Sequence, residues 1–197
     1  LAYLTARRAE LEERAISGGS AGEQQFYQFG RSQSLVKFTR PKIILPALSL
    51  EPRYTYDDNN IVVTGGGNGP YYLLRHHDGA GVTDHYLLAV LNHPVSEAFI
   101  RTNTSVFRGG YYSHGKQFIE DLPVPIPSDE ERATIDALVV RLIGAQGDIA
   151  AARTPHDRTL YERQALDLRQ QIEGHMTRLF GLSATDMDIV RAVPVPS

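Results

Sequence analysis

The stretch SDEERATIDALVVRLIGAQGDIAAARTPHDRTLYERQALDLRQQIEGHMTRLFGL, residues 128–182, decides the fold of this chain. Ser128 followed by Glu131 is a capping box, which predicts that a helix begins there. Beyond it, apolar residues recur at steps of three and four on both sides of Pro155, the spacing of one helix face. These residues are Ile135, Leu138, Leu142, Ala145, Ile149 and Ala152, and then Tyr161, Ala165, Leu168, Ile172, His175 and Leu179. Two such seams predict a long antiparallel helical hairpin, each seam about 27 Å long at 1.5 Å per residue.

Two glycines interrupt the first predicted helix of this hairpin. Gly144 and Gly147 each weaken a helix interior by about 1 kcal/mol, unless they permit close packing. We interpret the hairpin as a spacer or a clamp rather than a reaction site.

Upstream of the hairpin the sequence has the texture of strands and turns. Short β-rich runs are separated by prolines, an Asp-Asn turn and a glycine cluster. These runs are 35–38, 42–48, 53–56, 61–64, 71–74 and, after a loop, 118–126. A helix is expected from about His85 to Thr102, with Asp84 as its N-cap and Pro94 as a kink or break. The chain is therefore predicted to be α+β: a small mixed β-sheet domain with a packed helix, followed by the helical hairpin.

The segment FRGGYYSHGK, residues 107–116, carries the clearest binding chemistry. It holds two cations and three aromatic rings with no carboxylate, and the proline-rich QFIEDLPVPIP, residues 117–127, follows it. Arginine and lysine pair with phosphates, aromatic faces stack on bases, and glycines let the main chain approach a bulky partner. We interpret this segment as a nucleic-acid contact surface.

The formal net charge of −3 is low for a nucleic-acid binder, but the charges are unevenly spread. Between residues 23 and 56, five cations face two acids, a net of +3, and residues 98–119 hold three cations and no acid. From Ser128 onward, eight arginines face eleven acids, so the negative charge lies in the predicted hairpin. Ordinary variation of surface charge is the alternative explanation of this pattern.

Length and composition exclude several classes of protein. At 197 residues the chain can bury a core, and no apolar run approaches the roughly 18 residues that span a bilayer. It has no cysteine and no signal-like beginning, so we expect no disulfide, a soluble protein and a cytoplasmic location. Because the sequence opens at Leu1 without a methionine, we expect it to be a fragment of a longer protein.

Several segments in a fixed order resemble a known family. Besides residues 107–127, they are 29–33, 40–46, 86–92 and the Leu-Phe-Gly-Leu turn at 179–182. Together they are similar to the TaqI-like C-terminal target-recognition (specificity) domain of type IIG restriction-modification enzymes and related N6-adenine DNA methyltransferases. The resemblance extends roughly from Phe26 to Val190. The family also carries a pair of long helices after its Leu-Pro-Val-Pro-Ile-Pro strand.

The resemblance implies a division into three parts. Residues 1–20 would be a linker helix to an upstream methyltransferase domain of the same chain, 21–127 the target-recognition domain, and 128–197 the helical hairpin with a tail. Double-stranded DNA would be the partner. The missing catalytic domain would bind S-adenosylmethionine, flip the target adenine and transfer the methyl group, so no cofactor is expected in this fragment.

In such a domain, cations position the phosphates, and side chains from loops read the base edges. The expected DNA-binding residues are Arg31, Ser32, Gln33, Lys42, Arg53, Tyr54, Asn68, Arg108, Tyr111, Tyr112, His114 and Lys116. A solvated cation or a half-buried sheet residue is the alternative interpretation of each. No catalytic residue is expected, because Asn92-His93-Pro94-Val95 does not match the family's Asn-Pro-Pro-Tyr-type motif. The fragment itself is therefore not expected to be an enzyme.

Three other interpretations remain open from the sequence. The chain could be a specificity subunit of a multisubunit restriction system, whose recognition domains are also followed by long helices. It could be a small metal-dependent hydrolase that uses the histidines and aspartates of residues 76–78 and 84–85, or a nuclease with Lys42, Asp57 and Asp58. The glycine run 64–70 lacks the lysine and the following helix of a phosphate-binding loop. His175, on the second seam, is more typical of a core residue than of a ligand.

Overall fold

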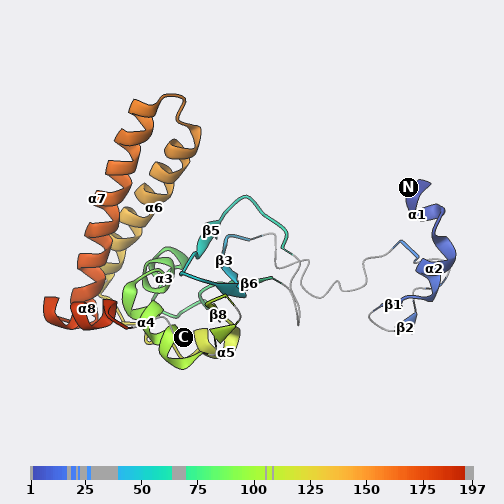
Figure 1. Ribbon diagram of the computed structural model, residues 1–197, viewed down its shortest axis with the longest axis horizontal. Helices are drawn as coiled ribbons and strands as arrows, with labels where there is room; N and C mark the ends of the chain where they lie inside the picture. The colour runs from blue at the N-terminus through green and yellow to red at the C-terminus, as the bar shows by residue number, and fades with distance from the viewer. Residues whose placement is uncertain are drawn as a thin grey trace. The chain divides into compact units, whose positions relative to one another are not determined.

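A computed structural model was obtained for the chain (Figure 1). It describes residues 2–16, 19–20, 22, 26–27, 40–63, 70–104, 106–107 and 109–193. The chain divides into two compact units, Leu1–Arg40 with Asn60–Val62, and Pro41–Asn59 with Val63–Ser197. The predicted strand at 35–38 lies outside the described residues.

The helices and strands in the described part of the first unit are short. Helices α1 (Ala2–Thr5) and α2 (Arg8–Glu13) precede the antiparallel pair β1 (Ala15–Ile16) and β2 (Gly19–Ser20). An Arg8–Glu12 ion pair of 2.6 Å supports α2 at the i, i+4 spacing that stabilises helices. The single linker helix expected from the sequence is thus two short helices followed by a small hairpin.

The second unit contains two small antiparallel sheets. In the first, β3 (Lys42–Pro46) lies between β5 (Thr55–Asp57) and β6 (Tyr71–Leu74). In the second, β8 (Tyr111–Ser113) lies between β4 (Leu48–Ser49) and β7 (Val106–Phe107).

Ala47 joins these two sheets. Its N–H donates to the carbonyl of Pro70 at 2.8 Å, and its carbonyl accepts from the N–H of His114 at 3.0 Å. The predicted strand at 42–48 is therefore one extended segment that serves both sheets in turn.

Two other strand predictions were wrong. Ile61–Val63 is irregular, and the segment predicted as a strand at 118–126 begins inside helix α5 (Lys116–Ile119) and then runs on without sheet pairing. Prolines at 123, 125 and 127 provide no N–H for a ladder, which explains why this apolar run stays unpaired.

The helix expected at 85–102 is two helices. Helix α3 (Asp84–Leu91) ends before α4 (Pro94–Asn103), because Pro94 cannot continue a helix and fits the first position of a new one. His93 caps α4 by accepting from the N–H of Val95 at 3.3 Å. Thr83, not Asp84, is the N-cap of α3, and its hydroxyl accepts from the N–H of Tyr86 at 3.0 Å.

The helical hairpin predicted from the sequence is confirmed. It consists of α6 (Asp129–Ala151) and α7 (Pro155–Leu179), and the capping box of Ser128 and Glu131 is present at the start of α6. A further helix, α8 (Ala184–Arg191), was missed, although Ser183 and Asp186 form a second capping box that signals it.

Helix α3 packs against both the β3 sheet and the hairpin, so one apolar core serves both parts (Figure 1). Its Tyr86 and Val90 are fully buried, and Ile43 of β3 and Ile135 of α6 belong to the same cluster. The α+β class is thereby confirmed, with separate antiparallel sheets in place of one mixed sheet.

A glycine in α7 offers a direct stability test. A Cβ built on Gly174 meets nothing within 4 Å, so an alanine fits without displacing a neighbour. We expect Gly174→Ala to raise the free energy of unfolding by about 1 kcal/mol, because glycine in a helix interior loses more backbone entropy than alanine. In thermal denaturation this corresponds to an increase of about 2–4 °C for a chain of this size. An unchanged or lower melting temperature would contradict an open site on a regular helix.

Candidate nucleic-acid interface

The glycines of residues 107–111 fold this segment into a tight hairpin between β7 and β8. Phe107 pairs with Tyr111 across the turn, and the N–H of Gly110 donates to the carbonyl of Phe107 at 3.1 Å. Gly109 and Gly110 have φ of +89° and +80°, which other residues rarely adopt. The Gly-Gly pair is thus required by the backbone of the turn.

The alternation of β8 sends its two tyrosines to opposite faces of the sheet. Tyr112 is fully buried, whereas Tyr111 is 43% exposed. Phe107, opposite Tyr111, is 48% exposed, and Leu48 and Leu50 are each 46% exposed. Leu48 pairs with Ser113 on this same outward side, and Leu50 lies 3.7 Å from a Cβ built on Gly110. We call Leu48, Leu50, Phe107 and Tyr111 the hairpin face.

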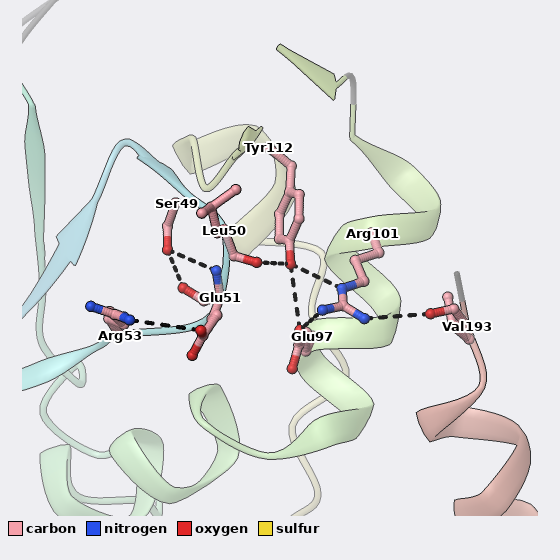
Figure 2. Close-up of polar contacts among 8 residues, drawn as sticks. All are labelled: Ser49, Leu50, Glu51, Arg53, Glu97, Arg101, Tyr112 and Val193. Carbon is pink, nitrogen blue, oxygen red and sulfur yellow. Dashed lines mark hydrogen bonds and ion pairs between the residues drawn. The ribbon is translucent and has the colours of Figure 1, made fainter. Parts of the chain in front are cut away.

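A polar network beneath this surface holds the hairpin in place (Figure 2). The hydroxyl of Tyr112 donates to the carbonyl of Leu50 and accepts from Nε of Arg101 at 2.9 Å. Arg101 also forms an ion pair with Glu97 one turn earlier on α4, and its Nη1 donates to the carbonyl of Val193 at 3.4 Å. One buried tyrosine therefore connects β8 to the end of β4 and to α4 (Figure 2).

His114 fixes the other end of β8. It is fully buried, and its Nδ1 lies 2.5 Å from the hydroxyl of Tyr54. Burial lowers the pKa of His114 to about 4, against a smaller opposing effect of the Ser49 carbonyl, so the ring is neutral near pH 7. Burial also raises the pKa of Tyr54, which keeps its hydroxyl protonated. A neutral pair of this kind is suited to positioning the strand, not to binding an anion.

The structure separates the expected DNA-binding residues into three groups. Tyr111, Arg53 and Lys116 are exposed to solvent. Four others are buried with relative exposures of 5% or less, and we therefore remove them from the contact set: Lys42, Tyr54, Tyr112 and His114. Arg31, Ser32, Gln33, Asn68 and Arg108 lie outside the described residues.

The cations of this region are partly neutralised by acids just beyond the acid-free segment. Lys116 lies 3.5 Å from Glu120, and Arg101 is paired with Glu97. Both pairs have the i, i+4 spacing of neighbours on a helix. The acidic partners, Glu97 and Glu120, lie one position outside the segment 98–119, so a charge count over that segment includes the cations and leaves out the acids. The exposed cation Arg53 lies 3.7 Å from Glu51. In the described part of the chain the hairpin face is therefore mainly aromatic and aliphatic, with Lys116 shortly after it in sequence.

Sequence reasoning missed part of this surface. Phe107 is one of the three rings of the segment 107–116 but was not among the expected contact residues, and the β7–β8 register places it opposite Tyr111. Leu48 and Leu50 had no such signal, since their exposure depends on a strand pairing with residues more than 60 positions away.

The histidine and aspartate residues considered as metal ligands make other contacts. Nδ1 of His76 lies 2.8 Å from Oδ1 of Asp84, which also accepts the N–H of His76 at 2.7 Å. Nδ1 of His77 is 2.8 Å from the carbonyl of Asp78. Among the described residues, no group of three or more such side chains could hold a metal ion. Two residues of the nuclease site considered from the sequence, Lys42 and Asp57, form a buried ion pair, so their side chains are not accessible to a substrate in this structure.

A groove of about 600 Å³ lies between the β4–β5 segment, the turn from α3 to α4, and the hairpin helices. Its histidine, His93, is only 3% exposed, stacks on Phe180 at a ring distance of 5.3 Å and lies 3.3 Å from the hydroxyl of Thr177. Burial lowers the pKa of His93 to about 4, against a smaller opposing effect of Glu173. These contacts give His93 a packing and capping role.

Comparison of the chain with models of known protein families and with curated protein sequences gives no match. None of the helices in the described ranges is long and apolar enough to cross a membrane.

Proposed function

We propose that this chain is a DNA target-recognition part of an N6-adenine DNA methyltransferase or of a fused restriction-modification enzyme. The observation that supports this most directly is the hairpin face, where two exposed aromatic rings flank a glycine turn. Such rings contact bases and sugars, and the glycines allow a close approach of the main chain. Specificity would reside in this chain and methyl transfer in a separate domain that binds S-adenosylmethionine.

The proposed contacts differ from those expected from sequence. Phe107 and Tyr111 would contact the DNA directly, and Lys116 and Arg53 would pair with phosphates, since both are exposed. Arg31, Ser32, Gln33, Asn68 and Arg108 remain proposed contacts on sequence grounds. A specificity subunit of a multisubunit system is the second candidate, favoured by the long α6–α7 hairpin. A second recognition unit with its own helix pair in the full protein would distinguish the two.

The proposal is tested by fluorescence anisotropy with duplex DNA and the chain of 197 residues. We expect Phe107→Ala and Tyr111→Ala each to weaken binding about tenfold, because each removes an exposed ring whose burial against the DNA would contribute about 1.5–3 kcal/mol. Leu166→Ala on α7 is the matched control, since Leu166 is also an exposed apolar side chain at 56%. Equal affinities for all three variants and the parent chain would contradict the hairpin face as the contact surface.

Salt dependence separates phosphate pairing from the ring contacts. We expect Lys116→Ala to reduce the slope of log K against log salt by about 0.9, the contribution of one phosphate contact, while Tyr111→Ala leaves the slope unchanged. A parent slope close to zero between about 50 and 200 mM salt would count against any phosphate-binding surface.

A further inference from the structure

Helix α6 carries a second apolar seam on the side opposite its buried one. Its members are spaced by steps of four and three, as in a heptad seam, and all are exposed: Ala133, Ala137, Val140, Gly144, Gly147 and Ala151. Val140 is 51% exposed, and the neighbouring Ile143 is 37% exposed. We call these six residues the outer seam. A helix of a protein in water normally carries polar side chains on an exposed face. Because all six residues of the outer seam are exposed, the seam has no packing partner among the described residues.

The two glycines of the outer seam have no packing role within the described chain. A Cβ on Gly144 or Gly147 meets nothing within 4 Å. Each glycine weakens the helix by about 1 kcal/mol, so the seam is stabilised only if something else approaches the backbone closely.

Charged residues beside the outer seam indicate what approaches it. Arg141 and Asp148 lie seven residues apart on the same flank of α6, and neither side chain makes a hydrogen bond or ion pair with any described residue. When a helix packs antiparallel against its own copy about a two-fold axis, each flank faces the same flank of the copy. Arg141 then meets Asp148 of the second copy, and Asp148 meets Arg141 of the second copy.

The same two-fold arrangement also aligns the outer seam with itself. With the axis near residue 145, Gly144 lies opposite Gly147 of the second copy, so the backbones can approach where both helices are narrowest. Val140 lies opposite Ala151 of the second copy, a large residue against a small one. The charge pairing and the apolar pairing place the axis within one residue of each other.

We propose that α6 binds a second copy of this chain, antiparallel, through the outer seam, with two reciprocal Arg141–Asp148 ion pairs. The inference is independent of the proposed DNA binding. The seam is one face of a helix of 23 residues, so the interface is small and we expect a weak dimer.

Sedimentation equilibrium with charge variants tests the pairing. The parent chain should show a monomer–dimer equilibrium, and Arg141→Asp or Asp148→Arg alone should weaken it about tenfold, because each places like charges opposite each other. An equimolar mixture of the two variants should form a heterodimer at least as well as the parent forms its homodimer. Gly174→Ala, on α7, is the control and should leave association unchanged. A monomer at all concentrations up to about 500 μM, or variants that associate like the parent, would overturn the proposal.

Orientation can be tested by cross-linking, because the chain has no cysteine of its own. Val140→Cys mixed with a size-tagged Ala151→Cys should give an oxidised heterodimer, whereas each variant alone should give little cross-linked product. In a parallel dimer, Val140→Cys alone would cross-link efficiently instead. Circular dichroism first checks that the variants have the helical content of the parent. If they do, either that result or an absence of cross-linking in the mixture contradicts the antiparallel arrangement.

Discussion

Replacing Lys42 by methionine is expected to lower the free energy of unfolding by about 3–5 kcal/mol. Lys42 is fully buried and pairs with Asp57, which is 2% exposed and lies opposite it in the β3–β5 register. Oδ1 of Asp57 also accepts the N–H of Asn59 at 2.9 Å. Methionine fills the volume of the lysine stem but removes the positive charge that lies against the buried carboxylate of Asp57. The free energy of unfolding of a small protein is about 5–15 kcal/mol in total, so the expected loss is a large share of the stability.

Chemical denaturation of Lys42→Met and Lys116→Met measures this effect with a matched control. Lys116 has an 84% exposed side chain and a 3.5 Å contact with Glu120, so its replacement should cost less than about 1 kcal/mol. The double variant Lys42→Met with Asp57→Leu should recover much of the loss, since it removes both buried charges. A loss of DNA binding by a stably folded Lys42→Met would instead return this residue to the contact set.

Acid is expected to destabilise the protein well above the pH at which carboxylates titrate. Burial lowers the pKa of both His93 and His114 to about 4, below the value of about 6.5 in an unfolded chain. Above pH 6.5 both rings are neutral in either state and stability is unaffected. Between about pH 6.5 and 4 the unfolded chain binds protons that the folded chain does not, so stability falls by about 1.4 kcal/mol per pH unit for each histidine. From pH 6.5 to 4.5 the two together lower it by on the order of 5 kcal/mol.

Urea denaturation at several values between pH 7 and 5 checks this slope. His93→Asn keeps an N-cap for α4, and His114→Gln keeps a polar atom near the hydroxyl of Tyr54. Each variant should lose about half of the parent's dependence on pH and be closer to the parent in stability at pH 5 than at pH 7. If the free energy of unfolding of both variants depends on pH as steeply as that of the parent, other groups cause the acid sensitivity.

Local patterns predicted the helical part of the fold and little of the candidate interface. The capping box at Ser128 and the seams of α6 and α7 depend on neighbours within one or two helical turns, which a sequence displays directly. The apolar run after Phe118 misled the strand prediction, because its prolines allow an extended chain but no ladder. The charge count over residues 98–119 failed for a similar reason, since Glu97 and Glu120 pair with the cations from just outside it.

The sequence by itself determined the class of the fold and the helical hairpin, because both follow from backbone geometry and short-range spacing. The tertiary structure alone decided which side chains are available to a partner. Tyr111 and Tyr112 are identical neighbours, and strand alternation requires only that they face opposite ways. Tyr112 is the buried one because its hydroxyl reaches Leu50 and Arg101, and Lys42 is buried because Asp57 lies on the adjacent strand. Partners that are distant in the chain fix these choices, so no local pattern could reveal them.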